Sequence, residues 1–363
     1  MRMSCDRCDE CRERGDNFCI YCGEMLGPMP RSGCDRCSEC LDDGYTYCMY
    51  CGKRLIPEEN VFLKIGYIVS IIAMLFVTFF LLFEYAVAIW GIPRVLPHLP
   101  DYGSTLILVI PEVIDILSFD GVSSQIYYIL LFIAVTVSIS LLIFNAYGPT
   151  VALINGDDKK IRDTALFDVS ILFLVLLIWE IIYIAIARSM GIEITTLPDH
   201  DDWVWMYELL EASVWEEVIT RMLMIGLPMA IVAVAKEEKG SWKKLFGGFE
   251  MDGTALFFIL FSAIMFGAGH VGGWGWWKFL PTFVFGLIAG YLFTKYGVYA
   301  TISMHFLNDY MSAESWIVGT DSAMTTLLML LIAFFCIPFT YIYVKRCVLA
   351  LRKILFNQSN VLR

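Results

Sequence analysis

The chain has 363 residues, of which 58% are hydrophobic and 17% are charged, and its mean hydropathy is +0.66. Soluble globular domains contain roughly 45–50% apolar and about 25% charged residues, so this composition excludes an ordinary soluble protein and indicates a polytopic membrane protein. The formal net charge of −11 argues against nucleic acid as the main partner, because nucleic-acid binding depends on a basic surface.

Ten of the twelve cysteines lie in the first 51 residues, in two copies of one pattern. The copies are CDRCDECRERGDNFCIYCG at 5–23 and CDRCSECLDDGYTYCMYCG at 34–52, so the period is 29 residues. Each copy contains two CxxC pairs, with an aromatic residue before the third cysteine and a glycine after the fourth. The paired cysteines are Cys5, Cys8, Cys19, Cys22, Cys34, Cys37, Cys48 and Cys51.

Four thiolates on two knuckles form the closed tetrahedral set that structural zinc requires. A unit this small lacks a sufficient core of its own, so metal binding would drive its folding. The sequence therefore predicts a tandem zinc ribbon in residues 1–57 with two structural zinc sites. Two further cysteines, Cys11 and Cys40, leave Cys8/Cys11 open as an alternative first knuckle. A disulfide framework is the competing explanation, but paired CxxC knuckles in tandem suit a metal better.

A membrane-spanning helix needs about 20 apolar residues, and eight segments within 61–350 meet that requirement. The segment 104–119 is apolar but short and contains Pro111, so we expect it to be interfacial or re-entrant. The predicted fold is an all-α polytopic membrane protein, with about eight transmembrane helices and a small N-terminal tandem zinc ribbon. The eight predicted spans are 61–92, 124–146, 166–188, 203–235, 254–271, 279–296, 298–318 and 323–349.

Basic residues predict the orientation of these spans. Lysine and arginine are concentrated in 147–165, in 236–252 and after Lys345, whereas 189–202 is acidic and contains neither. The positive-inside rule then places both termini in the cytoplasm. Zinc thiolates, which require a reducing compartment, independently predict a cytoplasmic N-terminus. We expect the protein in a prokaryotic cell membrane, archaeal membranes included.

Three charged side chains interrupt the fourth predicted span, in the stretch SVWEEVITRML at 213–223. An ionised group near the bilayer centre costs from about 3 to above 10 kcal/mol unless it is paired or hydrated. Arg221 follows Glu217 by four residues on the same helical face, so these two can form an ion pair. Glu216 points about 100° away and is left unpaired.

Two of the four histidines, His270 and His305, also fall inside or at the end of predicted spans, and Asp309 shares a helical face with His305. Three separate helices thus bring polar groups to the interior of the bundle. A hydrogen-bond network that holds the helices together is one explanation. Two imidazoles beside an unpaired glutamate favour a catalytic site instead.

These residues resemble the motifs of a known family. EEVITR (216–221) matches EExxxR, FGAGH (266–270) matches FxxxH, and HFLND (305–309) matches a histidine followed after three residues by asparagine or aspartate. In this order on separate spans, the motifs resemble those of the CAAX-protease and bacteriocin-processing family of intramembrane endopeptidases, over about residues 165–320. The resemblance implies an eight-helix bundle with a catalytic cavity inside the membrane.

The resemblance also implies a role for each site residue. Glu216 with His270 would activate a water, His305 and Asp309 would hold the developing oxyanion or a metal, and Glu217 and Arg221 would brace the site. The chain has Asp309 where the best-known members carry asparagine, and an ionised aspartate cannot donate a hydrogen bond to an oxyanion. We favour a metal-free mechanism in which the glutamate is the base. A divalent metal held by Glu216, His270 and His305 is the alternative.

The predicted function is therefore an intramembrane endopeptidase that cuts a peptide or protein with a hydrophobic or lipidated tail. Its expected surroundings are membrane lipid, and the ribbons are candidates for recruiting the substrate or a protein partner. Two other functions are compatible with the sequence. One is a non-catalytic membrane adaptor or sensor that retains the family scaffold, and the other is a proton-coupled transporter, because carboxylates and histidines also build proton relays.

Overall fold

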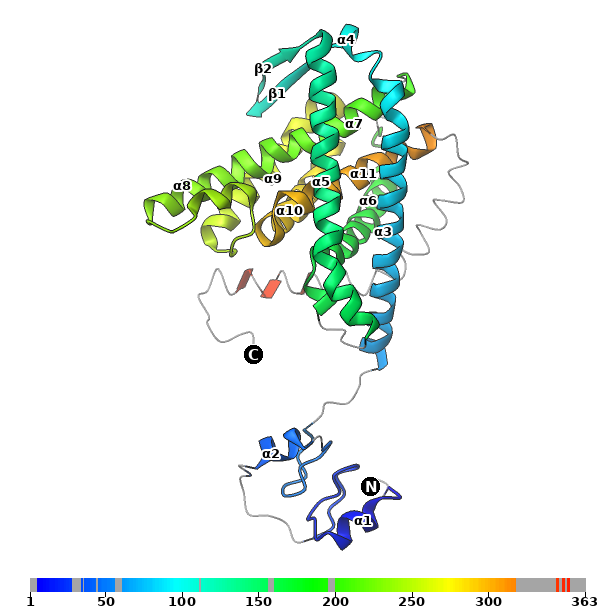
Figure 1. Ribbon diagram of the computed structural model, residues 1–363, viewed down its shortest axis with the longest axis vertical. Coiled ribbons are helices and arrows are strands. Elements are labelled where there is room, and N and C mark those ends of the chain that lie inside the picture. Colours follow the sequence, from blue (N-terminus) through cyan, green and yellow to red (C-terminus); the bar gives the residue numbers. More distant parts are fainter. Residues whose placement is uncertain are drawn as a thin grey trace. The chain divides into compact units, whose positions relative to one another are not determined.

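The computed structural model describes residues 5–27, 34, 36–43, 45–55, 61–110, 112–155, 160–194 and 200–317, with six further positions between 344 and 352. The chain divides into two compact units, Met1–Tyr67 and Ile68–Arg363. We refer to them as the ribbon unit and the membrane unit, and each is considered by itself (Figure 1).

The ribbon unit contains the two cysteine repeats, each with one short helix, α1 (Cys8–Glu13) or α2 (Cys37–Asp42). Isolated antiparallel bridges, Phe18 with Met25 and Tyr47 with Arg54, close the second knuckle of each repeat. The glycine after the fourth cysteine adopts a positive φ in both repeats, +72° at Gly23 and +68° at Gly52. Only glycine adopts this conformation without strain, so the repeated glycine is explained by the turn around each cysteine cluster.

The two repeats pack against each other reciprocally. The Phe18 amide donates to the carbonyl of Met49 (3.1 Å), and the Tyr47 amide donates to the carbonyl of Ile20 (3.0 Å). These two bonds are related by the 29-residue period, so the same contact is made in both directions. The unit is therefore a pseudo-twofold pair of ribbons.

The membrane unit is mostly helical, and the described residues include six helices long and apolar enough to cross a membrane, which bears out the predicted fold class of polytopic all-α membrane protein. These six are Ile68–Val95 in α3, Gly121–Ile154 (α5), Ala165–Ser189 (α6), Asp202–Ala235, Gly253–Trp274 (α9) and Trp276–Tyr296. The fourth, Asp202–Ala235, comprises α7 (Asp202–Glu217), the π-helix η2 (Val218–Gly226) and α8 (Leu227–Ala235). The sixth comprises the 3-10 turn η4 (Trp276–Lys278) and α10 (Phe279–Tyr296). The other helical elements of the unit are α4 (Leu99–Tyr102), η1 (Lys160–Asp163), η3 (Ser241–Phe246) and α11 (Val298–Ile317), and α3 itself begins at Val61.

Two of the eight predicted spans are not among these six helices. The seventh, 298–318, is the helix α11, which is not among the six that meet the length and hydropathy required for a span. The eighth, 323–349, lies almost entirely outside the described residues. The number of crossings and the orientation of the chain therefore stay predictions.

The segment 104–119, expected to be interfacial or re-entrant, forms a β-hairpin. Strand β1 (Ser104–Ile110) pairs antiparallel with β2 (Glu112–Phe119), and the register shifts between Leu106 and Ile107. The segment is rich in isoleucine and valine, which favour extended backbone, and its proline cannot donate to a strand ladder. Figure 1 shows the hairpin beside the end of α5 that lies near α4.

Small residues allow the helices around the centre of the unit to approach closely. A Cβ on Gly286 of α10 would lie 2.9 Å from the Cα of Ala263 on α9, and one on Gly290 would lie 2.7 Å from the Ile259 side chain. Close approach through small residues is typical of membrane helix packing, where dispersion contacts and hydrogen bonds hold helices together. It fixes α9, which carries His270, against α10.

Candidate functional site

The Glu216–Glu217 pair lies at the junction between an α-helix and a π-helix. Helix α7 ends at Glu217, and η2 begins at Val218. Pro228, in the first turn of α8, has no N–H to donate to the preceding turn, and the π-helix ends just before it at Gly226. π-helical turns are frequent at functional sites because they change the direction of side chains on a helix.

The expected ion pair between Glu217 and Arg221 is present and fully buried. Arg221 Nε lies 3.2 Å from Glu217 Oε2, and both side chains are 0% exposed. Arg221 Nη1 also donates to Ser262 Oγ on α9 (3.1 Å), and that hydroxyl donates to the carbonyl of Thr220 (2.5 Å). A buried charge pair is tolerated better when further hydrogen bonds satisfy its atoms. Here Ser262 bonds Arg221 Nη1, whereas Arg221 Nε and Glu217 Oε2 have only their ion pair within the described residues.

His305, on α11, connects this ion pair to Glu216. Its Nδ1 lies 2.9 Å from Glu217 Oε1, while its Nε2 lies 3.6 Å from Glu216 Oε2 and 3.3 Å from Asp309 Oδ2. Carboxylate oxygens face both ring nitrogens, and an imidazole can donate from both nitrogens only when it is protonated. The arrangement therefore favours a positively charged ring between three acidic side chains.

His270, on α9, is the second histidine close to Glu216. Its Nδ1 lies 2.8 Å from the carbonyl of Phe266. A carbonyl only accepts, so Nδ1 carries the proton and Nε2 of the neutral ring is an acceptor. Nε2 lies 4.0 Å from Glu216 Oε2, which is too long for a direct hydrogen bond and suits a bridging water.

A cavity of about 420 Å³ opens next to these groups. Of the six predicted site residues, only Glu216 and His270 line it, with side chains 32% and 20% exposed. His305, at 6%, lies behind Glu216, and Asp309, Glu217 and Arg221 are also absent from the cavity wall. The other lining residues are mostly apolar and include Ile219, Met224, Met265, Phe266 and Trp274.

The sequence did not indicate several residues that the structure adds to this region. Ser262, which bonds Arg221, precedes Phe266 and His270 by four and eight residues, so its helical spacing was a usable signal. Glu208 and Glu211 also line the cavity. Glu208 precedes Glu216 by eight residues, and Glu211 precedes Trp215 by four. The hairpin residues Thr105 and Ile107 line it too, and no local pattern could have predicted this.

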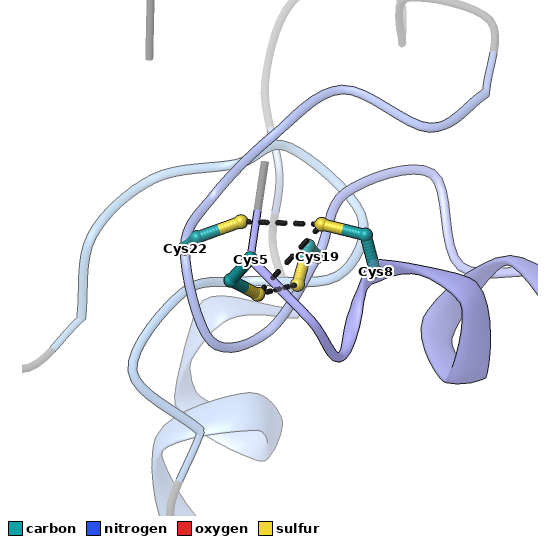
Figure 2. Close-up of side chains that lie close together, drawn as sticks. All are labelled: Cys5, Cys8, Cys19 and Cys22. Carbon is teal, nitrogen blue, oxygen red and sulfur yellow. Dashed lines mark hydrogen bonds between the residues drawn. The ribbon is translucent and has the colours of Figure 1, made fainter. Parts of the chain in front are cut away.

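The paired cysteines of each ribbon form a compact cluster. Figure 2 shows the sulfurs of Cys5, Cys8, Cys19 and Cys22 facing one another. Their ligand atoms all lie within 4.8 Å of one another, as do those of Cys34, Cys37, Cys48 and Cys51. The hydrogen-bonded sulfur pairs within the two clusters are 3.5–3.7 Å apart. Tetrahedral zinc with Zn–S bonds of about 2.3 Å places sulfurs about 3.8 Å apart, so both clusters fit the predicted tandem zinc ribbon.

Backbone hydrogen bonds lower the pKa of one thiol in each cluster, Cys22 and Cys48, whereas burial raises the pKa of Cys8 and Cys37. Burial raises the pKa of the Cys48 thiol, but hydrogen bonds from the backbone at Tyr50 and Cys51 outweigh it, and the pKa falls to about 7. A thiol must lose its proton to bind zinc, so this environment suits a ligand. The extra cysteines lie beside the clusters, with Cys11 Sγ 3.6 Å from Cys19 Sγ and Cys40 Sγ 3.7 Å from Cys48 Sγ.

A catalytic metal is a poorer match to the described residues. Within the described ranges, the two cysteine clusters are the only groups of three or more histidine, cysteine, aspartate or glutamate ligands that lie within 4.8 Å of one another. Nε2 of His305, which would have to face the metal, faces two carboxylates instead. We therefore assign no chemical step to a metal at Glu216, His270 and His305.

No curated protein and no solved structure matches the chain. A family model does match, over residues 200–311, and its description is "Type II CAAX prenyl endopeptidase Rce1-like". The matched segment contains all six predicted site residues and runs from the start of α7 into α11. The resemblance predicted from the three motifs is confirmed at this level, since residues 200–311 carry the pattern of the Rce1-like CAAX prenyl endopeptidases.

Proposed function

We propose that this chain is an intramembrane endopeptidase in which Glu216 and His270 activate the attacking water. The observation that carries the proposal is the 4.0 Å gap between Glu216 Oε2 and His270 Nε2 at the wall of the cavity. Glu216 Oε2 is buried and has no hydrogen-bond partner within the described part of the chain, so it is an unsatisfied acceptor that a bridging water would satisfy.

Both groups that border the gap are acceptors, which suits a nucleophilic water. With hydrogen bonds of about 2.8 Å, a water bridging the gap would subtend an angle of about 90°, close to its own H–O–H angle. Both of its protons would be directed at acceptors, and its lone pairs would face the cavity. Glu216 would take a proton as the water attacks the peptide carbonyl and pass it to the leaving amine.

The buried residues behind Glu216 support this role electrostatically. A protonated His305 places positive charge 3.6 Å from the Glu216 carboxylate, while Glu217 and Asp309 stabilise the charged ring. In this arrangement Asp309 accepts from His305, so the replacement of the family's asparagine by aspartate is compatible with the proposal. His305 and Asp309 then orient and stabilise Glu216, because neither lines the cavity where an oxyanion would form.

The chemistry of the cavity supports the proposed substrate class. Its mostly apolar walls suit a hydrophobic or lipidated segment that enters from the membrane. Its polar side chains include Glu208, Glu211 and Thr105 besides the proposed catalytic pair. The family match adds support at the level of reaction type, because it covers the whole set of site residues.

Cleavage of a fluorogenic peptide library in detergent tests the proposal. Replacing the base by Glu216→Gln keeps the shape of the side chain, and we expect turnover to fall by roughly 10²–10⁴-fold, the range for losing a general base. Glu250→Gln, an exposed acidic residue, is the matched control and should keep wild-type turnover. Equal turnover by Glu216→Gln and the control would reject the assigned base.

A further inference from the structure

Neither outer edge of the two-stranded β-hairpin is paired with a further strand within the described ranges. The sheet has two strands, so β1 has β2 along one side only, and no third strand pairs with it within the described ranges. An unpaired edge presents a row of N–H and C=O groups that can pair with another extended chain. In a largely apolar environment such groups are costly to leave without partners.

The hairpin is held against the proposed catalytic helix. Trp215 Nε1 donates to the carbonyl of Ile107 in β1 (2.9 Å), and Trp215 directly precedes Glu216. Thr105 and Ile107, two residues apart on β1, lie in the wall of the cavity that contains Glu216 and His270. A chain that lies along β1 would therefore border the cavity that contains the proposed catalytic pair.

We propose that the substrate binds as an extended strand that pairs with the edge of β1 not joined to β2, beside the Ile107 carbonyl that Trp215 already occupies. Strand addition uses main-chain hydrogen bonds for affinity and presents the scissile bond in an extended form, which suits an enzyme that must hold a peptide carbonyl next to a fixed water. The substrate class this names is an unfolded or extended peptide segment that adjoins a hydrophobic anchor.

A second cavity gives such a strand a continuous path. It has a volume of about 400 Å³ and is lined by Tyr102, Ser104, Ser118 and Tyr207, among others. Thr105, Glu208 and Glu211 line both cavities, so the two adjoin along the start of β1. The second cavity is lined mostly by polar residues, whereas the first is lined mostly by apolar ones. A substrate lying along β1 would thus place its polar residues in one cavity and its hydrophobic part in the other.

Because this inference rests on the proposed function, the test has two steps. The first step selects a peptide from the fluorogenic library that the wild-type protein cleaves. The second step measures binding of that peptide to the inactive Glu216→Gln variant by fluorescence anisotropy, with each backbone amide N-methylated in turn. Strand pairing predicts a period of two, in which methylation at alternate residues weakens binding at least tenfold and methylation between them changes it little.

Photo-cross-linking supplies an independent readout. Benzoylphenylalanine at position 107 of β1 should capture the peptide, whereas the same group at position 116 of β2, an exposed position, should not. If no peptide is cleaved in the first step, the proposed function fails. If a peptide is cleaved but methylation has no alternating effect, or if position 107 captures only lipid, strand addition is wrong and the proposed function stands.

Discussion

Replacing Arg221, whose ion pair is buried, should destabilise the protein far more than replacing a cation whose ion pair is shorter but exposed. Arg221 and Glu217 are both fully buried, and Arg221→Met would leave the Glu217 carboxylate without its guanidinium. Breaking a buried pair by deleting one partner costs about 3–5 kcal/mol. His305 lies 2.9 Å from Glu217 and compensates part of the charge, so we expect the lower end of that range.

The measurement is thermal unfolding in detergent, followed by tryptophan fluorescence. At roughly 2–4 °C per kcal/mol for a chain of this size class, Arg221→Met should lower Tm by roughly 6–12 °C. Lys244→Met is the matched control, because its ion pair with Glu238 is shorter (2.6 Å) but exposed, and such pairs contribute about 0–1 kcal/mol. Adding Glu217→Gln to Arg221→Met should restore part of the loss, since it removes the uncompensated charge.

Two results would refute this reasoning. One is a Tm for Arg221→Met within about 2 °C of that for Lys244→Met, which would mean that burial does not amplify the pair. The other is strict additivity in the double variant, which would mean that the two side chains do not interact.

Three further predictions concern the hairpin and the ribbons. Trp215→Phe removes the hydrogen bond to Ile107 and should raise KM roughly 2–10-fold with kcat little changed. This is the effect of losing about 0.5–1.5 kcal/mol of binding free energy from one hydrogen bond. An equal fall in kcat would contradict this role. Gly52→Ala places a Cβ 2.5 Å from the Phe18 ring, so it should destabilise the zinc-loaded ribbons. Gly15→Ala is the control, because Gly15 also has a positive φ but a Cβ there would have nothing within 4 Å. Equal melting points for the two variants would disprove the packing argument. Metal analysis should return about two zinc atoms per chain, released by chelators or by falling pH as the thiolates are protonated, and zinc retained after replacement of all ten N-terminal cysteines would point to the histidine site.

Local patterns in the sequence determined a large part of this protein. The apolar segments gave the helical membrane unit, because about 20 apolar residues in a row suffice to specify a span. The four-residue spacing of Glu217 and Arg221 predicted their ion pair, since such residues are neighbours on any helix. The cysteine spacing predicted both clusters, because the ligands of a knuckle are adjacent in the chain.

Long-range contacts were decided only by the tertiary structure. His305 reaches Glu217 across 88 residues, and Trp215 reaches Ile107 across 108, and neither distance follows from periodicity. Helical spacing tells which side chains share a face of one helix. Which other helix packs against that face depends on how closely the two can approach, and small residues such as Gly286 allow that approach. The same limit explains the hairpin, whose strands stabilise each other by pairing that the hydropathy of either strand alone does not reveal.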